Sequence, residues 1–312
     1  MSNAVSQNIA PGVVAVFVTM NRAATARVCL ERLMAQSLRP ERVFVVDNAS
    51  SDGTPADLKE FAEQVDWMSY EILPANLGNA GGMEVAFKRV FDEGAESVWI
   101  LDDDSWPEPD ALRELLTAEI SGECIRTCCV VDLRKNQLSW PLQIRDGEGW
   151  KLVDQRSGLP TEKSVLVRRA WLGALIPRSV YKRVGNVNGA LFLRGEDEDY
   201  PRRIEAEGID TYLMPGSLLH HPASGPLKHW HVGKYTVVVE TSLEGNPLYY
   251  RLRNSWWMAR RDRGILVALA MSILTGLVML RWKPRPLSWM GVWLEALGDA
   301  LMNRLGRRGS KR

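Results

Sequence analysis

Residues 13–19, "VVAVFVT", give the strongest indication of the fold of this chain. Its first six residues are all apolar, without alternation between polar and apolar side chains. A strand of this kind is covered on both faces, as in a parallel sheet between two layers of helices. A helical pattern over residues 23–36 follows, and "RVFVVDN" (42–48) reads as a second buried strand. The three segments together predict a βαβ unit.

The alternation of strand and helix continues along the chain and predicts an α/β fold with a largely parallel sheet. Its further members are a helix at 55–64, a strand at 70–73, a helix that ends near Asp92 and a strand at 97–101. Residues 121–167 are irregular, and we expect antiparallel strands and loops there. The last members are a helix at 178–184, an apolar strand at 190–194, a turn at Gly195 and an acidic helix start.

Acidic residues gather where the predicted strands end. Asp47 ends the second strand, and Asp102, Asp103 and Asp104 directly follow the strand at 97–101. In a parallel sheet the carboxyl ends of the strands share one edge, and ligands bind beyond it. Three adjacent carboxylates repel one another, and Mg²⁺ and Mn²⁺ prefer carboxylate oxygens. The triplet therefore indicates a divalent metal site, and a solvated turn or a helix cap is the alternative.

A second acidic group, "RGEDED" (194–199), opens a helix. By itself this group is typical of a solvated helix start, which the helix dipole stabilises without any catalytic role. Two histidines, His220 and His221, follow a later apolar strand, where they are either structural residues or metal ligands.

The loop "NLGNAGG" (76–82) is rich in glycine and leads into a helix. It lacks the spacing G-x-G-x-x-G, so we do not expect a dinucleotide site. Gly78, Gly81 and Gly82 permit close approach of a ligand and present backbone N–H groups to a phosphate or a sugar. The alternative is a loop that only starts the helix.

Six motifs in a fixed order give the chain a resemblance to a known family. They are "FVTMNR" (17–22), "VVDNASSDGT" (45–54), "NLGNAGG" (76–82), "WILDDD" (99–104), "LRGEDEDYPRRI" (193–204) and "LHHP" (219–222). Over residues 13–225, and more weakly to about residue 260, the chain resembles the family 2 inverting glycosyltransferases, which have a GT-A fold. Within the family the chain looks most like the bacterial galactofuranosyltransferases. The segments that carry this likeness are "NLGNAGG" (76–82), "RGEDED" (194–199) and "YYRLRN" (249–254). Rhamnosyltransferases that act on lipid-linked acceptors are also similar.

The resemblance implies a nucleoside-diphosphate sugar as donor, either UDP-galactofuranose or dTDP-rhamnose. It implies a polyprenyl-diphosphate-linked saccharide as acceptor and Mn²⁺ or Mg²⁺ as cofactor. The implied nucleotide-sugar contacts are Thr19, Arg22, Asp47, Gly78, Gly81, Gly82, Asp102 and Asp103. For Asp47, the alternative is a turn-forming residue before Asn48.

The resemblance also implies roles in catalysis and metal binding. Asp197 is the implied base, with Glu196 beside it, and Asp199 and Trp171 are implied acceptor-binding residues. Core packing suits Trp171 equally well. The implied metal ligands are Asp104, Asp102, His221 and His220, of which His221, followed by Pro222, aligns better than His220.

The C-terminal third has a different character, which predicts a membrane-associating helical extension. Residues 264–280 carry no charge, five arginines lie in residues 251–263 before them, and Arg281, Lys283 and Arg285 follow. A helix of that length spans about 26 Å, which is marginal for a hydrocarbon core of about 30 Å. We therefore expect a helix in the interface at the cytoplasmic face of the inner membrane. A buried helix or a dimer contact is the alternative.

Composition limits the remaining possibilities. A length of 312 residues suits two modest domains, which we place at 11–225 for the transferase and 226–312 for the helical region. The net charge of +1 gives no reason to expect nucleic acid as a partner. Four cysteines without paired C-x2-C spacing predict reduced thiols in a cytosolic protein.

Two rival functions remain open in the sequence. A sugar-1-phosphate nucleotidyltransferase would need a glycine-rich, basic loop after the first strand, which "FVTMNRAAT" (17–25) does not provide. A non-catalytic scaffold with a degenerate GT-A fold would bind the membrane without turnover, but Asp47, Asp102, Asp104 and Asp197 are intact. The donor sugar, the linkage formed and the oligomeric state leave no readable motif.

Overall fold

The computed structural model describes residues 8–117, 120–133, 137–223, 225, 227–232, 235–283 and 287–309. The chain forms two compact units. The first unit contains the chain up to Leu77, Gly82–Val187 and Tyr200–Ala223. The second unit contains Gly78–Gly81, Asn188–Asp199 and the chain from Ser224 on. Two segments from within the predicted 11–225 domain thus belong to the second unit, and the predicted boundary at 225/226 stays a prediction.

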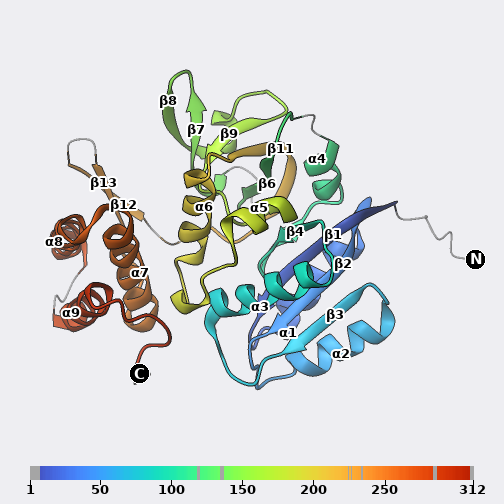
Figure 1. Cartoon of the computed structure of the whole chain (residues 1–312), viewed down its shortest axis with the longest axis horizontal. Coiled ribbons are helices and arrows are strands. Elements are labelled where there is room, and N and C mark those ends of the chain that lie inside the picture. Colours follow the sequence, from blue (N-terminus) through green and yellow to red (C-terminus); the bar gives the residue numbers. More distant parts are fainter. Residues whose placement is uncertain are drawn as a thin grey trace, which may run out of the picture. The chain divides into compact units, whose positions relative to one another are not determined.

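The first unit is built on an 11-stranded sheet whose N-terminal part is parallel. β1 (Asn8–Thr19) lies between β2 (Leu38–Asp47) and β4 (Ser97–Ile100), and β3 (Met68–Ile72) pairs with β2 (Figure 1). Thr19 is in register with Asp47, so these two residues lie at the same edge. The predicted α/β fold with a parallel sheet is confirmed.

Helices cover both faces of this parallel part. One face carries α1 (Ala23–Met34), α2 (Thr54–Gln64) and α4 (Ala111–Thr117). The other face carries α3 (Gly78–Asp92), α5 (Arg178–Val184) and the later part of α6 (Glu196–Ala206). The sheet therefore has a hydrophobic core on each side.

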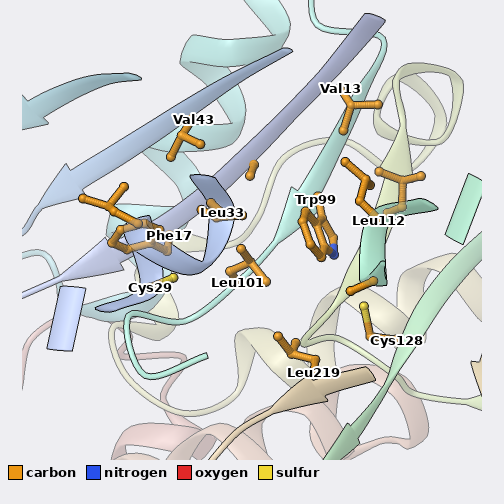
Figure 2. Packing of buried hydrophobic residues seen from close by; sticks show 14 of the residues in the cluster. Val13, Phe17, Cys29, Leu33, Val43, Trp99, Leu101, Leu112, Cys128 and Leu219 are labelled. Carbon is orange, nitrogen blue, oxygen red and sulfur yellow. The ribbon is translucent and has the colours of Figure 1, made fainter. Parts of the chain in front are cut away.

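The decisive stretch lies in β1 and serves both cores. Val13, Ala15 and Phe17 belong to one core, and Val14, Val16 and Val18 belong to the other. Figure 2 shows Val13 and Phe17 in the first of these cores, together with side chains of neighbouring elements such as Leu33 and Trp99. Successive side chains of a strand point to opposite faces, which explains why every position of the run is apolar.

The sheet continues beyond β4 with strands of mixed direction. β10 (Ala174–Pro177) pairs antiparallel with β4 and with β6 (Cys124–Val131), and β6 pairs parallel with β11 (Asp210–His220). The remaining strands are β5 (Trp106–Pro107), β7 (Gln137–Asp146), β8 (Gly149–Gln155) and β9 (Val165–Arg168), with a short 3-10 turn η1 (Arg156–Gly158). The predicted antiparallel strands of residues 121–167 therefore extend the same sheet.

The prediction of a strand at residues 190–194 is wrong. A short 3-10 turn, η2 (Gly189–Leu191), is followed by a turn with positive φ at Phe192 (66°), Arg194 (57°) and Gly195 (141°). An extended strand has negative φ throughout, so these residues do not form one. The prediction rested only on the apolar character of the segment. The turn leads directly into α6.

Three helices and a hairpin form most of the second unit. The helices are α7 (Gly245–Arg263), α8 (Ile265–Trp282) and α9 (Leu287–Leu301), and β12 (Leu227–Val232) pairs with β13 (Tyr235–Glu240). Gly264, at φ 92°, separates α7 from α8. Trp256, Val278, Met279 and Ala296 belong to the hydrophobic core of this unit. The predicted C-terminal helical region is confirmed.

Candidate active site

The three aspartates form a closed turn after β4. The backbone N–H of Ser105 donates to the carbonyl of Asp102 (3.0 Å), and the N–H of Asp102 donates to the hydroxyl oxygen of Ser105 (3.1 Å). This turn holds the three carboxylates in fixed directions at the end of the parallel part of the sheet. The triplet therefore belongs to a hydrogen-bonded turn and not to a solvated loop.

Asp102, Asp104 and His221 form a group that could hold a metal ion. One ligand atom from each of them lies within 4.8 Å of the others. His221 Nε2 lies 3.2 Å from Asp104 Oδ1 and 3.8 Å from Asp102 Oδ2. The backbone N–H of His221 donates to the carbonyl of Val131 (3.0 Å), which continues the pairing of β11 with β6 and places the imidazole.

The donor atoms of this group suit Mn²⁺ or Mg²⁺. His221 Nδ1 lies 2.7 Å from the carbonyl oxygen of Pro222, so Nδ1 carries the proton and Nε2 faces the carboxylates. A metal-binding histidine commonly donates its other N–H to such an acceptor. Burial alone would raise the pKa of Asp104, but His221 and Arg22 lower it to about 2. Two carboxylates and an imidazole match Mn²⁺ slightly better than Mg²⁺.

Asp103 points into the protein instead. Its carboxylate accepts a hydrogen bond from the Thr19 hydroxyl (2.9 Å) and pairs with Arg22 (2.8 Å), which also pairs with Asp104 (2.8 Å). Burial raises the pKa of Asp103 to about 6, although Arg22 and Thr19 oppose this shift. Thr19 and Arg22 thus contact aspartates of the triplet, and their predicted contacts with the nucleotide sugar stay predictions.

Asp47 is fully buried at the end of β2. One carboxylate oxygen accepts the backbone N–H of Ser50 (3.0 Å), as a turn-forming aspartate does. The other oxygen is buried and has no hydrogen-bond partner in the described part of the chain. A buried acceptor without a donor is costly, so this oxygen fits a donor group from a bound ligand.

Two glycines of residues 76–82, Gly78 and Gly82, pack closely against other protein atoms. All three predicted glycines are buried. A side chain on Gly78, at φ 74°, would overlap the carbonyl of Phe192, and one on Gly82 would lie 2.7 Å from Val18. The backbone N–H of Ala80, between them, donates to that same carbonyl of Phe192 (3.1 Å). The packing of α3 accounts for Gly78 and Gly82, and the structure gives no support to the predicted ligand contacts of the three glycines.

Two predicted side chains have other partners. His220 Nε2 lies 2.8 Å from Glu108, and its Nδ1 lies 3.5 Å from the carbonyl of Asp132, so the structure does not bring His220 into the metal group. Trp171 is 7% exposed and stacks on Phe87 within a hydrophobic core. Core packing therefore accounts for Trp171, and its predicted contact with the acceptor stays a prediction.

The acidic start of α6 lies in the second unit and offers one accessible carboxylate. Glu196 is buried and accepts a hydrogen bond from Asn79 (2.8 Å), and Asp199 is 1% exposed and pairs with Arg261. Asp197 is exposed, and its carboxylate accepts the backbone N–H of Gly195 (2.9 Å). Of the three predicted residues, Asp197 is placed best to meet a substrate.

The surroundings of Asp197 change its acidity. Neighbouring protein atoms reduce the hydration of its carboxylate although solvent reaches it, and this raises its pKa. The charge of Glu198 raises the pKa further, whereas Arg251, Gly195 and Arg194 lower it. A carboxylate with a raised pKa is a stronger base than an ordinary one, as proton abstraction requires.

Several residues around these groups have no role predicted from the sequence. Trp140 meets the His221 ring edge-on, with 5.1 Å between the ring centroids. Arg253 and Asn254 lie buried beneath the turn before Asp197, and both belong to the quoted motif "YYRLRN". That motif was therefore the available signal, while nothing in the sequence singles out Trp140.

Comparison with protein families shows to which family the chain belongs. Residues 14–185 match the model of "Glycosyl transferase family 2". The chain belongs to glycosyl transferase family 2. The resemblance seen in the motifs is thus confirmed, and this glycosyltransferase carries its metal group and Asp47 in the first unit and Asp197 in the second.

The chain is also similar in sequence to two named galactofuranosyltransferases. The chain is 31% identical over 217 residues to the galactofuranosyltransferase GlfT1 of Mycobacterium tuberculosis, covering 67% of this chain and 70% of the relative. It is 28% identical over 220 residues to GlfT1 of Mycolicibacterium smegmatis, with the same coverage.

Solved structures agree in fold. GalNAc-T7 with UDP, GalNAc and Mn²⁺ is similar with a TM-score of 0.57 at 14% identity, covering 81% of this chain and 49% of that one. S. aureus TarS 1-349 is similar with a TM-score of 0.54 at 14% identity, covering 93% of this chain and 80% of that one. These likenesses support the GT-A fold of this glycosyltransferase.

Proposed function

We propose that this glycosyltransferase moves galactofuranose from UDP-galactofuranose to a polyprenyl-diphosphate-linked saccharide, with inversion and with a divalent cation, in the synthesis of a cell-surface polysaccharide. The observation that carries the proposal is the group of Asp102, Asp104 and His221, whose ligand atoms lie within 4.8 Å of one another. Galactofuranosyltransferases at 31% identity support the choice of sugar.

The donor is held by groups of the first unit. The unpartnered oxygen of Asp47 accepts the imide N–H of the uracil ring, which supplies the missing donor. Arg22 and Asp103 shape the same end of the sheet. Asp102, Asp104 and His221 would hold a divalent cation, which when bound would supply positive charge to the diphosphate leaving group.

The transfer itself is a single displacement. The acceptor hydroxyl oxygen forms a bond to the anomeric carbon while the bond from that carbon to the diphosphate oxygen breaks. The hydroxyl proton passes to the carboxylate of Asp197, and UDP leaves with the bonding electrons. Attack from the opposite side inverts the anomeric configuration, and the base assists by removing the proton as the bond forms.

Donor-dependent thermal stability tests this function. The wild-type protein is heated with UDP, UDP-galactofuranose, dTDP or dTDP-rhamnose, each with Mn²⁺ or with EDTA. We expect the unfolding temperature to rise with the uridine compounds and only in the presence of Mn²⁺. A preference for the thymidine compounds would favour the second candidate, a rhamnosyltransferase. No shift with any compound would favour a non-catalytic scaffold and contradict the proposal.

We also propose that the protein lies peripherally on the cytoplasmic face of the inner membrane through α8. In the described part of the chain, α8 is the one helix long and apolar enough to cross a membrane, and 22% of it is buried. Leu266, Ile273, Leu277 and Leu280 are 46–78% exposed and follow helical spacing, so they form one apolar stripe. An apolar stripe flanked by arginines suits the interface of an anionic bilayer.

A further inference from the structure

The turn that precedes Asp197 has an unfavourable backbone. Phe192 and Arg194 adopt φ values of 66° and 57°, in the left-handed region that side chains disfavour, and Gly195 follows at 141°. Residues with a side chain persist in this region only where the surrounding structure holds them there. Something must therefore hold this turn, and it lies immediately before the proposed base.

The side-chain amide of Asn254 holds the turn. Its Nδ2 atom carries two N–H groups and lies within hydrogen-bonding distance of three carbonyl oxygens, those of Leu191 (3.1 Å), Leu193 (3.0 Å) and Arg194, so two of these oxygens share one N–H group. Asn254 is 1% exposed and comes from α7, about sixty residues along the chain. One buried amide thus contacts three carbonyl groups of the turn. These carbonyl groups belong to a segment that is not part of a strand.

Arg253 sets the orientation of that amide. Its Nε donates to Asn254 Oδ1 (2.9 Å), and its Nη2 donates to the carbonyl of Leu191 (2.7 Å). A guanidinium group has no acceptor, so the atom of Asn254 that faces it must be the oxygen. The N–H groups of Asn254 therefore face the turn.

The contact reaches the carboxylate of Asp197 through Gly195. A side chain on Gly195 would place its Cβ 2.9 Å from Cβ and Nδ2 of Asn254, so the glycine lies directly against the amide. The backbone N–H of Gly195 donates to Asp197 Oδ1 (2.9 Å). The position of Gly195, set by Asn254, thus determines where the hydrogen bond to Asp197 points.

We infer that Asn254 is a positioning residue for the transfer reaction, which acts through residues 191–195 to hold the carboxylate of Asp197 in place. The inference rests on the proposed role of Asp197 as base. All the contacts that carry it lie within the second unit, whereas Asp47 and the metal group lie in the first. Asn254 should therefore influence the chemical step and leave the binding of the donor unchanged.

Steady-state kinetics with Asn254→Ala test the inference. The probes are UDP-galactofuranose with Mn²⁺ and a synthetic prenyl-diphosphate disaccharide. We expect kcat to fall about one hundred-fold, because a shift of about 1 Å in a catalytic group has that effect. The KM for UDP-galactofuranose and the Mn²⁺-dependent stabilisation by UDP should stay within two-fold of wild type.

Two further variants provide a control and a second test of the same contact. Asn246→Ala is the matched control, because Asn246 is an exposed residue of the same helix whose side chain accepts from Arg308. It should retain kcat. Gly195→Ala displaces the same contact from its other side and should lower kcat as Asn254→Ala does, which keeps the inference testable if Asn254→Ala does not fold.

The outcomes separate the inference from the proposed function. A folded Asn254→Ala protein, or a folded Gly195→Ala protein where the first does not fold, that keeps kcat within two-fold would overturn the inference. So would a loss confined to the KM for the donor, because Asn254 would then shape the donor site. Asp197→Asn is measured beside them: if it keeps kcat, the proposed base is wrong, whatever Asn254 does.

Discussion

At the scale of single residues, the three adjacent aspartates are not equivalent. Asp103 is 5% exposed and is held by Thr19 and Arg22, while Asp102 and Asp104 face His221. In the protein alone, Arg22 pairs with Asp103 and Asp104, and the His221 ring lies against Asp102 and Asp104. Two carboxylates are thereby left on one side, where a divalent ion would meet them.

The two adjacent histidines give a matched pair of variants. His221→Ala removes a nitrogen from the metal group and is expected to abolish the Mn²⁺-dependent stabilisation by UDP and to lower kcat at least one hundred-fold. His220→Ala removes a ring that pairs with Glu108 and should keep the Mn²⁺ response. Thermal unfolding with a Mn²⁺ titration checks both. The assignment of the metal group fails if His220→Ala loses the Mn²⁺ response and His221→Ala keeps it.

The acidity of Asp197 predicts a pH dependence. The carboxylate must be ionised to accept a proton, and its pKa lies above the ordinary value because of reduced hydration and the charge of Glu198. The rate should therefore fall as pH falls through this raised pKa, and it should be retained above it. Arg251 lowers the pKa, so Arg251→Gln should move this acid limb to higher pH. Profiles of kcat/KM against pH, which report the free enzyme, measure the shift for both proteins.

A matched control for that profile is Arg42→Gln. Arg42 pairs with Glu93 on the first unit and lies outside the groups that act on Asp197. The acid limb of this control should coincide with that of the wild type. For Arg251→Gln, an acid limb that stays in place or moves to lower pH would contradict the assignment of Asp197 as the titrating base.

At the scale of elements, the regular parts of the first unit could be predicted because their signals are local. The run at 13–19 is apolar at each position because β1 serves two cores, and the helix predicted at 178–184 begins and ends as predicted. The segment 190–194 could not be predicted. Its conformation depends on Asn254 and Arg253, and no local pattern shows that a distant amide will hold a left-handed turn.

The candidate site shows the same division. The position of the aspartate triplet, Asp47 and His221 could be predicted, because each lies at or shortly after the end of a strand that the apolar pattern reveals. The sequence could not separate His220 from His221, since neighbouring side chains on a strand differ only in the face to which they point. It also could not tell that Trp171 stacks on Phe87, because an aromatic residue suits a core and a sugar equally.

The apolar stripe of α8 gives a prediction for this element. Ile273→Glu combined with Leu280→Glu places two charges on exposed positions of α8 and should release the protein from vesicles containing anionic lipid. Flotation of the protein with vesicles measures binding. Leu133→Glu with Leu152→Glu is the matched control, because both leucines are similarly exposed on the first unit. Equal binding by the two double variants would contradict a role of the stripe.

At the scale of the whole molecule, the chemical groups are divided between the two units. The metal group and Asp47 belong to the first unit, and Asp197 with the turn before it belongs to the second. The second unit is assembled from segments far apart in the chain, and its last described residues return to the turn. Gly306 donates its N–H to the carbonyl of Ala190 (2.6 Å) and accepts from Arg253 (2.6 Å). The C-terminal segment is therefore expected to affect catalysis without affecting the donor.

Shortening the chain tests this division. A protein that ends at Arg304 loses Gly306 and also the contact between the Arg308 N–H and the Tyr250 hydroxyl (2.7 Å). It leaves Arg253 with an unsatisfied N–H group, which weakens the support of Asn254 and the turn. We expect kcat to fall at least ten-fold while the Mn²⁺-dependent stabilisation by UDP is retained. A protein that ends at Gly309 keeps both contacts and should match the wild type. If the shorter protein instead loses the response to Mn²⁺ and UDP together with its activity, the two units do not work independently, and the division of roles between them is wrong.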